Sequence, residues 1–169
     1  QADDSWDSTT GRLGLDYRTG AGNLLYASVS KGFKSGIFPS QNNVVQNVGV
    51  ATPEEEVWSY EIGAKTEWFD RTLRVNGSVF FSKYTDLHLT LASCPQFGAA
   101  PACAVVANAG NAEMRGVELE GTLRPTRAWS MDASASYLKF KYTFINPAAG
   151  GPTRLTGPQL ETLAIIAYR

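Results

Sequence analysis

Apolar and polar residues alternate along much of the chain, and a period of two is the pattern of β-strands. The clearest stretch is residues 58–69, which read WSYEIGAKTEWF. Every second residue from Trp58 to Trp68 is apolar or small, with aromatic rings at both ends, whereas the residues between are mostly charged or small. At about 3.3 Å per residue and a tilt of about 40°, the two tryptophans are separated by roughly 25 Å in height. That height matches the apolar band of an outer-membrane β-barrel, which has aromatic residues at both interfaces.

The same alternation predicts seven strands, joined by short turns at one end and long loops at the other. The predicted strands are residues 9–18, 24–32, 56–69, 71–91, 105–124, 128–142 and 160–168. The short turns are residues 19–23, 70–71 and 125–127. The long segments, rich in Gly, Pro, Asn and Ala, are residues 32–55, 92–104 and 143–159. This arrangement is typical of up-and-down barrels, so we predict an all-β, antiparallel wall of a transmembrane β-barrel.

Alternation assigns the side chains of each predicted strand to two faces. The residues predicted to face lipid are Trp58, Tyr60, Ile62, Ala64, Trp68, Leu73, Val75, Val79, Phe81, Val117, Leu119, Leu123, Trp129, Met131 and Tyr137. The residues predicted to face a lumen are Glu61, Lys65, Glu67, Arg74, Glu118, Glu120 and Asp132. Gly110 and Gly116 are predicted to mark bulges or bends in one long strand.

A soluble β-sandwich that binds a ligand also produces alternation, with the apolar faces turned to a common core. Three details favour lipid instead. Large branched residues are scarce at mid-strand, where a packed core needs them. Aromatic residues lie at the ends of the apolar faces, and several predicted strands exceed the usual length of about five or six residues.

The charged face indicates that the chain is only part of a barrel. A narrow, filled barrel would bury many charges, which is costly unless nearly all are paired. A water-filled or plugged lumen removes that cost, but such barrels need about 16 strands or more. Seven strands on their own would also leave two unpaired edges in lipid.

Composition excludes several other classes. Lys plus Arg number 15 and Asp plus Glu 16, so the net charge of -1 gives no electrostatic footprint for nucleic acid. No apolar run approaches the roughly 18 residues of a membrane helix. The start, QADDSWDSTT, lacks the basic and apolar regions of a signal peptide, so we expect a mature or internal segment.

Candidate chemistry is sparse. Cys94 and Cys103 lie close together in SCPQFGAAPAC, which favours a local disulfide in an oxidising compartment over two free thiols. His88 is the only histidine, so we predict no metal site, no cofactor, and a polar position in the lumen or at its rim. Glu118 and Glu120 have no nucleophile or metal set beside them, so we expect lumen ion pairs and no enzymatic step.

The segment KGFKSGIFPSQNN contains the weak ligand-binding candidates Phe33, Lys34 and Phe38. Aromatic rings and a cation in an extracellular loop suit an anionic ferric chelate. The more ordinary interpretation is a strand end, where Lys and Phe lie at the membrane interface and Gly makes a bend.

Three stretches of the chain resemble the TonB-dependent outer-membrane receptors, and most closely the branch of iron-complex (siderophore) receptors. They are LLYASVSKGFKSGIF at 24–38, TPEEEVWSYEIGAKTEWFDRTLRVNGSVFFSKYTDL at 52–87, and NAGNAEMRGVELEGTLRPTRAWSMDASASYLKFKY at 108–142. The resemblance runs from about Arg12 to Tyr142 and is specific for the family, not for a ligand.

The resemblance implies a barrel of about 22 strands that encloses an N-terminal plug domain, in the outer membrane of a bacterium. Such a receptor imports a ferric siderophore or a similarly scarce solute, with energy delivered by TonB. Residues 1–169 are then a partial barrel domain, without the plug, the TonB box or the closing C-terminal strand. The implied partners are outer-membrane lipid, the rest of the barrel and its plug, TonB and the solute. The alternatives are a small self-closing or oligomeric porin-like or adhesin-like barrel and the soluble β-sandwich.

Overall fold

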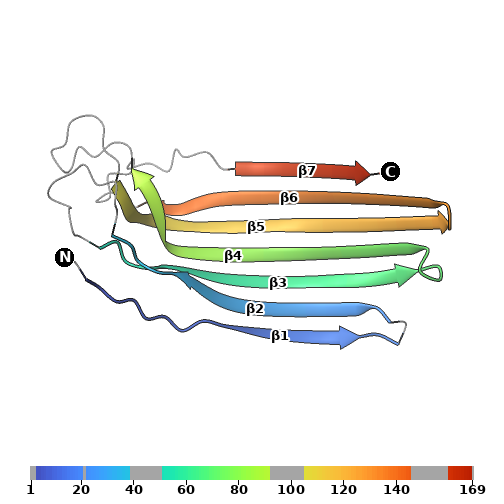
Figure 1. The fold of residues 1–169 in the computed structure, drawn as a ribbon, viewed down its shortest axis with the longest axis horizontal. Coiled ribbons are helices and arrows are strands. Elements are labelled where there is room, and N and C mark those ends of the chain that lie inside the picture. Colours follow the sequence, from blue (N-terminus) through green and yellow to red (C-terminus); the bar gives the residue numbers. More distant parts are fainter. Residues whose placement is uncertain (1–2, 21, 39–50, 92–104, 146–159, 169) are drawn as a thin grey trace.

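The computed structural model describes residues 3–20, 22–38, 51–91, 105–145 and 160–168. These residues form one antiparallel sheet of seven strands, in which each strand pairs with its neighbours in the sequence (Figure 1). The strands are β1 (Gly11–Arg18), β2 (Leu24–Lys34), β3 (Glu55–Trp68), β4 (Leu73–Leu91), β5 (Val105–Thr126), β6 (Trp129–Ile145) and β7 (Leu160–Tyr168). The predicted fold class and all seven strands are confirmed. The largest difference in a boundary is at β6, which was predicted to end at residue 142 and ends at Ile145.

The sheet is open within the described part of the chain. The order runs from β1 to β7, and these two strands form its edges. No helix of the described residues is long and apolar enough to cross a membrane. The turns β1–β2, β3–β4 and β5–β6 lie at one end of the sheet, called here the turn end, and the opposite end is called the loop end (Figure 1).

The β3–β4 turn shows how the turn end is made. Phe69, Asp70 and Arg71 all have positive φ, 53°, 52° and 68°, and the Thr72 amide donates to the Phe69 carbonyl oxygen at 3.0 Å. Positive φ at both central residues defines a type I′ turn, whose twist matches that of two antiparallel strands. The predicted turn at residues 70–71 is therefore confirmed.

Cross-strand pairing divides the side chains between two faces, named here after Ile62 and Glu61. On the Ile62 face, Ile62 lies between Ala27 of β2 and Val79 of β4. On the Glu61 face, Glu61 lies between Ser28 and Phe80. Directly opposed residues of an antiparallel pair point to the same side of the sheet, so this register places every described strand residue on one face or the other.

The sheet is a single layer among the described residues. Ala112 is their only buried hydrophobic residue, whereas Leu13, Leu15 and Ile62 are more than 60% exposed on the Ile62 face. A β-sandwich would cover that face with a second sheet. The exposed apolar face thus disagrees with the sandwich alternative. It agrees with the wall of a β-barrel whose apolar face is turned to lipid.

Candidate functional site

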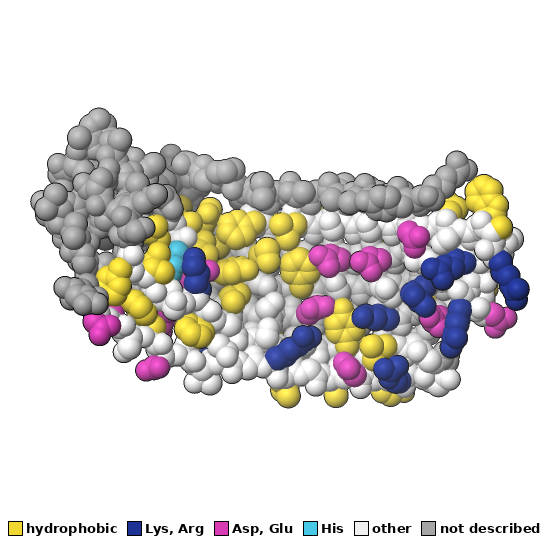
Figure 2. Space-filling model, in the orientation of Figure 1, with side chains coloured by type: hydrophobic (Ala, Val, Ile, Leu, Met, Phe, Trp, Pro, Cys, Tyr) yellow, Lys and Arg dark blue, Asp and Glu magenta, His cyan; other side chains and the backbone are white. Residues whose placement is uncertain are grey.

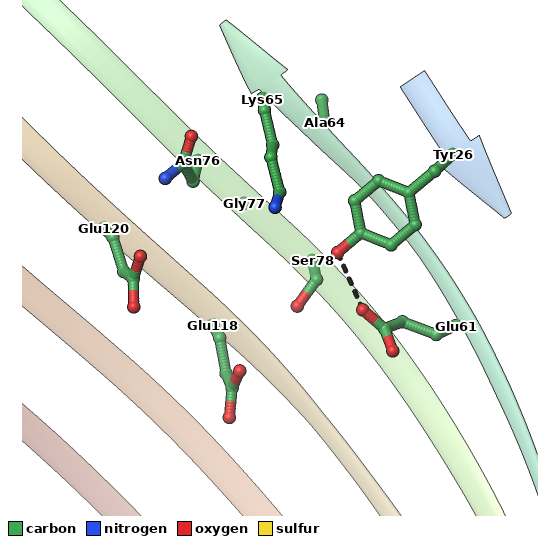
Figure 3. Close-up of a pocket in the computed structure, with 9 residues that line it drawn as sticks. All are labelled: Tyr26, Glu61, Ala64, Lys65, Asn76, Gly77, Ser78, Glu118 and Glu120. Atoms are coloured by element: carbon green, nitrogen blue, oxygen red, sulfur yellow. Dashed lines mark hydrogen bonds between the residues drawn. The ribbon is translucent and has the colours of Figure 1, made fainter. Parts of the chain in front are cut away.

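Polar side chains gather on the Glu61 face over the half of the sheet nearer the turn end (Figure 2). They line a shallow pocket of about 160 Å³ (Figure 3). The lining residues are Tyr26, Glu61, Ala64, Lys65, Asn76, Gly77, Ser78, Glu118 and Glu120. Strands β2, β3, β4 and β5 all contribute, so only the folded sheet brings these groups together.

Tyr26 and Glu61 form the one hydrogen bond drawn across this pocket. The Tyr26 hydroxyl donates to Glu61 Oε1 at 2.7 Å (Figure 3). Gly63 faces the Tyr26 ring in the register, and a Cβ on Gly63 would lie 2.5 Å from ring atoms. A side chain at residue 63 would therefore displace the Tyr26 ring, which lies against the backbone there.

Ion pairs continue this polar surface toward the turn end. Arg74 donates through Nη2 and Nε to Glu67 Oε1, at 2.8 and 3.2 Å. Arg71 Nε lies 3.1 Å from Glu67 Oε2, so one carboxylate binds two guanidinium groups. Thr122 Oγ1 donates to Asp132 Oδ1 at 2.7 Å on the neighbouring strands. All seven residues predicted to face a lumen lie on this Glu61 face.

The residues predicted to face lipid all share the opposite, Ile62 face. Trp58, Tyr60 and Phe81 form a stacked series there, with ring centroids 6.5 and 6.3 Å apart. Exposed aliphatic residues of β3, β4 and β5 continue this face toward the turn end, where Trp68 and Trp129 lie exposed. The predicted grouping of side chains thus matches the register of the sheet.

Nearer the loop end the Glu61 face becomes apolar, which the sequence interpretation missed. Cross-strand partners place these side chains in adjacent rows over β4, β5 and β6, and we call them the Phe140 cluster. Its members are Phe80, Tyr84, Met114, Leu138, Phe140 and Tyr142. Phe140 and Tyr142 meet edge to face, with centroids 5.1 Å apart and an interplanar angle of 88°. Figure 2 shows hydrophobic side chains over this part of the face.

A change in the phase of the alternation marks the Phe140 cluster in the sequence. Phe80–Phe81 and Tyr137–Leu138 are consecutive apolar pairs, so apolar residues switch from one face to the other at each pair. Beyond the second pair, Lys139 and Lys141 alternate with Phe140 and Tyr142. If the apolar and polar alternation is continued unchanged across these pairs, it predicts polar side chains on the Glu61 face, and the cluster is missed.

His88 joins the loop ends of three strands. Its Nε2 atom lies 2.6 Å from the Pro53 carbonyl oxygen, and its amide donates to Glu55 Oε2 at 2.9 Å. Asn108 Nδ2 lies within hydrogen-bond distance of the carbonyl oxygens of Pro53, Glu54 and Asp86. The register of β4 and β5 shifts here, and Asp86 has a φ of 54°. His88 and Asn108 together therefore connect the start of β3 to β4 and β5.

The three weak ligand-binding candidates are not brought together on one face. Phe33 pairs with Glu56 on the Ile62 face, whereas Lys34 pairs with Glu55 on the Glu61 face. Phe38 lies beyond β2, and its ring meets Trp6 edge to face at 5.9 Å. Cys94 and Cys103 lie outside the described residues. Among those described, no three His, Cys, Asp or Glu side chains are arranged to hold a metal ion.

A single-layer, up-and-down antiparallel sheet with one exposed apolar face and one polar face defines a segment of a transmembrane β-barrel. The family model "TonB dependent receptor-like, beta-barrel" matches residues 1–163. The chain belongs to this family, which confirms the predicted resemblance. Proteins of this family lie in the outer membrane of Gram-negative bacteria, and this chain is a segment of such an outer-membrane barrel.

Known relatives and structures agree with the family. The chain is 29% identical to the pesticin receptor of Yersinia pestis over 140 residues, which is 81% of this chain and 19% of that protein. The ferric yersiniabactin uptake receptor FyuA from Yersinia pestis matches with a TM-score of 0.59 and 25% identity, over 79% of this chain and 18% of that one. The alcaligin outer-membrane receptor FauA from Bordetella pertussis matches with a TM-score of 0.54 and 21% identity, over 92% of this chain and 25% of that one. The chain thus spans about a fifth of the length of the curated relatives it matches.

Proposed function

We propose that the chain is a section of the wall of a TonB-dependent transporter that imports a ferric siderophore or a similar scarce solute. The Ile62 face meets lipid, and the Glu61 face lines the lumen. The observation that carries this proposal is the exposed apolar belt on one face of a sheet whose other face is charged. The family match favours this function over a self-closing porin-like or adhesin-like barrel. The chain contributes no enzymatic step.

The two parts of the Glu61 face have different roles in this proposal. The polar part, with Glu61, Lys65 and Glu118, contacts the plug domain inside the lumen. Its charges remain in a hydrated, hydrogen-bonded setting and avoid the desolvation cost of a dry core. The Phe140 cluster lies nearer the loop end, where long loops open to the outside in barrels of this kind. It offers aromatic surface to an arriving solute, with Lys34 as a cation on the same face.

The binding candidates predicted from the sequence differ in how well they fit the proposed transporter. Lys34 lies on the lumen side, which supports it as a ligand contact. Phe33 lies on the lipid side, which supports an interfacial role, since aromatic residues are enriched at the headgroup level. The Cys94–Cys103 disulfide remains a prediction, as does the recruitment of TonB by a segment outside residues 1–169.

The proposed transport is tested with the full-length receptor that contains this segment, expressed in cells lacking other siderophore receptors. We expect uptake of radioactive iron from at least one of a panel of ferric siderophores, and its loss in a strain without TonB. Uptake that persists without TonB would indicate a passive pore and contradict the proposal. A correctly inserted receptor that binds none of the siderophores in the panel would contradict the proposed substrate class.

The Phe140 cluster provides a prediction for single side chains. We expect Phe140→Ala combined with Tyr142→Ala to weaken binding of the transported solute about tenfold, because aromatic contacts contribute roughly 0.5–1.5 kcal/mol each. Titration of the purified receptor by quenching of tryptophan fluorescence measures the affinity. The control is Tyr60→Ala combined with Phe81→Ala, which removes equivalent rings from the Ile62 face. If the control weakens binding as much, the cluster is not the contact surface.

A further inference from the structure

A row of charged residues crosses the Ile62 face where its apolar belt ends. Lys31, Trp58, Lys83, Glu113 and Lys141 are successive cross-strand partners from β2 to β6. In the next row toward the turn end, Phe81, Arg115, Lys139 and Glu161 are partners in the same way. In these two adjacent rows, cations lie at positions that aliphatic side chains occupy elsewhere on the Ile62 face. We call these residues, with Glu56, the charged band.

Cations outnumber carboxylates in the charged band. Its cations are Lys31, Lys83, Arg115, Lys139 and Lys141, and its carboxylates, placed by the register, are Glu56, Glu113 and Glu161. Lys31 forms an ion pair with Glu56. Lys83, Arg115 and Lys141 are exposed and form no ion pair within the described residues. These three side chains therefore present uncompensated positive charge at the edge of the apolar belt.

Among the described residues, the turn end of the same face carries no such band. There the Ile62 face ends in Tyr17, Trp68, Leu73, Leu123 and Met131, all uncharged. Uncharged aromatic and aliphatic ends are the ordinary termination of a lipid-facing belt. A belt bounded by cations at the loop end alone matches a bilayer whose headgroups on that side are anionic.

Aromatic rings lie directly beside the charged band. Trp58 belongs to its first row and stacks on Tyr60, which in turn stacks on Phe81. Tryptophan and tyrosine mark the level of headgroups, so the band lies at that level and not in the hydrocarbon. Lysine and arginine there direct their charges outward and keep their alkyl stems along the apolar surface.

We propose that the charged band binds the phosphorylated headgroups of lipids on the loop side of the membrane. Phosphate is the headgroup that these cations match, because it accepts paired N–H donors from a guanidinium and single donors from ammonium groups. Lys83 and Lys141 are two strands apart, about 10 Å by strand spacing, with Arg115 in the adjacent row. This spacing suits a lipid that carries more than one phosphate. The inference rests on the proposed function, which turns the Ile62 face toward lipid.

The test uses the full-length receptor in micelles, with native mass spectrometry to count bound lipids. The probes are diphosphoryl lipid A, its dephosphorylated form and inorganic phosphate. We expect the dephosphorylated lipid to bind at least tenfold more weakly, and millimolar inorganic phosphate to leave the bound diphosphoryl lipid in place. Equal binding of the two lipids, or displacement by inorganic phosphate, would overturn the proposal.

Variants locate the binding. The combination Lys83→Gln, Arg115→Gln and Lys141→Gln is expected to reduce binding of diphosphoryl lipid A at least tenfold. The matched control, Arg18→Gln, Arg124→Gln and Arg127→Gln, removes the same charge at the turn end and is expected to keep wild-type binding. The variant Lys83→Arg with Lys141→Arg keeps the charge and is expected to bind as the wild type, which separates loss of charge from loss of folding. Equal loss in the control would overturn the assignment to the band.

The same preparations separate this inference from the proposed function. A receptor that inserts into vesicles and imports iron, yet binds both lipids equally, refutes the charged band alone. A receptor that neither inserts nor imports refutes the proposed function.

Discussion

Ile62→Arg is expected to destabilise the intact barrel by about 2–4 kcal/mol, whereas Glu61→Arg is expected to cost much less. Ile62 is 62% exposed and lies between Ala27 and Val79, in the middle of the apolar belt. An arginine there places a guanidinium near the bilayer midplane, where neither water nor a carboxylate compensates its desolvation. Glu61, one residue away, points to the opposite face. An arginine at residue 61 loses the hydrogen bond from Tyr26 but remains among polar groups.

The measurement is the free energy of unfolding of the full-length receptor in lipid vesicles, from urea titration followed by tryptophan fluorescence. Ile62→Leu serves as the control for the site itself and is expected to change stability by under about 1.5 kcal/mol. If arginine at residues 61 and 62 has the same cost, the assignment of the two faces to lumen and lipid is wrong.

The strands and their faces were predictable because both depend on local alternation. From Trp58 to Trp68 the side chains keep one phase throughout, and the observed register puts them on one face as predicted. A period of two requires only that successive side chains point to opposite sides, which holds for any strand. Even β7, the least regular of the predicted strands, pairs with β6 along its length.

Features that depend on height in the membrane were not predictable in the same way. The residues of the Phe140 cluster resemble lipid-facing residues in type but lie on the Glu61 face, because the strands continue past the apolar belt. The sequence pattern groups Phe33 with Lys34 because it predicts that the strand ends at residue 32. Since β2 extends to Lys34, the two side chains point to opposite faces.

Contacts between distant segments leave little trace in the sequence. His88 approaches the carbonyl oxygen of Pro53, 35 residues earlier in the chain, and no spacing rule connects them. Two of the glycines of β5 were predicted to mark bulges or bends, and the register treats them differently. Gly110 adjoins register shifts, as a bulge would require, whereas Gly116 lies in regular pairing between Phe80 and Leu138, so no bulge lies there.

Gly116→Val is expected to destabilise the barrel by about 2–3 kcal/mol, because residue 116 has no room for a side chain. A Cβ at this position would lie 2.6 Å from the Phe80 ring and 2.6 Å from the Tyr137 carbonyl oxygen. Phe80 can rotate away, but the carbonyl belongs to the adjacent strand and moves only if β6 separates from β5. The same change disturbs the Phe140 cluster, so we expect affinity for the solute to fall as well.

Gly121→Val is the matched control for this prediction, since it adds the same side chain to the same strand. The nearest atom to a Cβ on Gly121 is the Arg74 carbonyl oxygen at 4.0 Å, and residue 121 lies on the Ile62 face among Val75 and Ala133. A valine there meets lipid without a clash, so its expected cost is near zero. Urea unfolding in vesicles and titration with the solute measure both variants. Equal losses at residues 116 and 121 would mean that any valine weakens β5, and that the crowding between Phe80 and β6 does not explain the glycine.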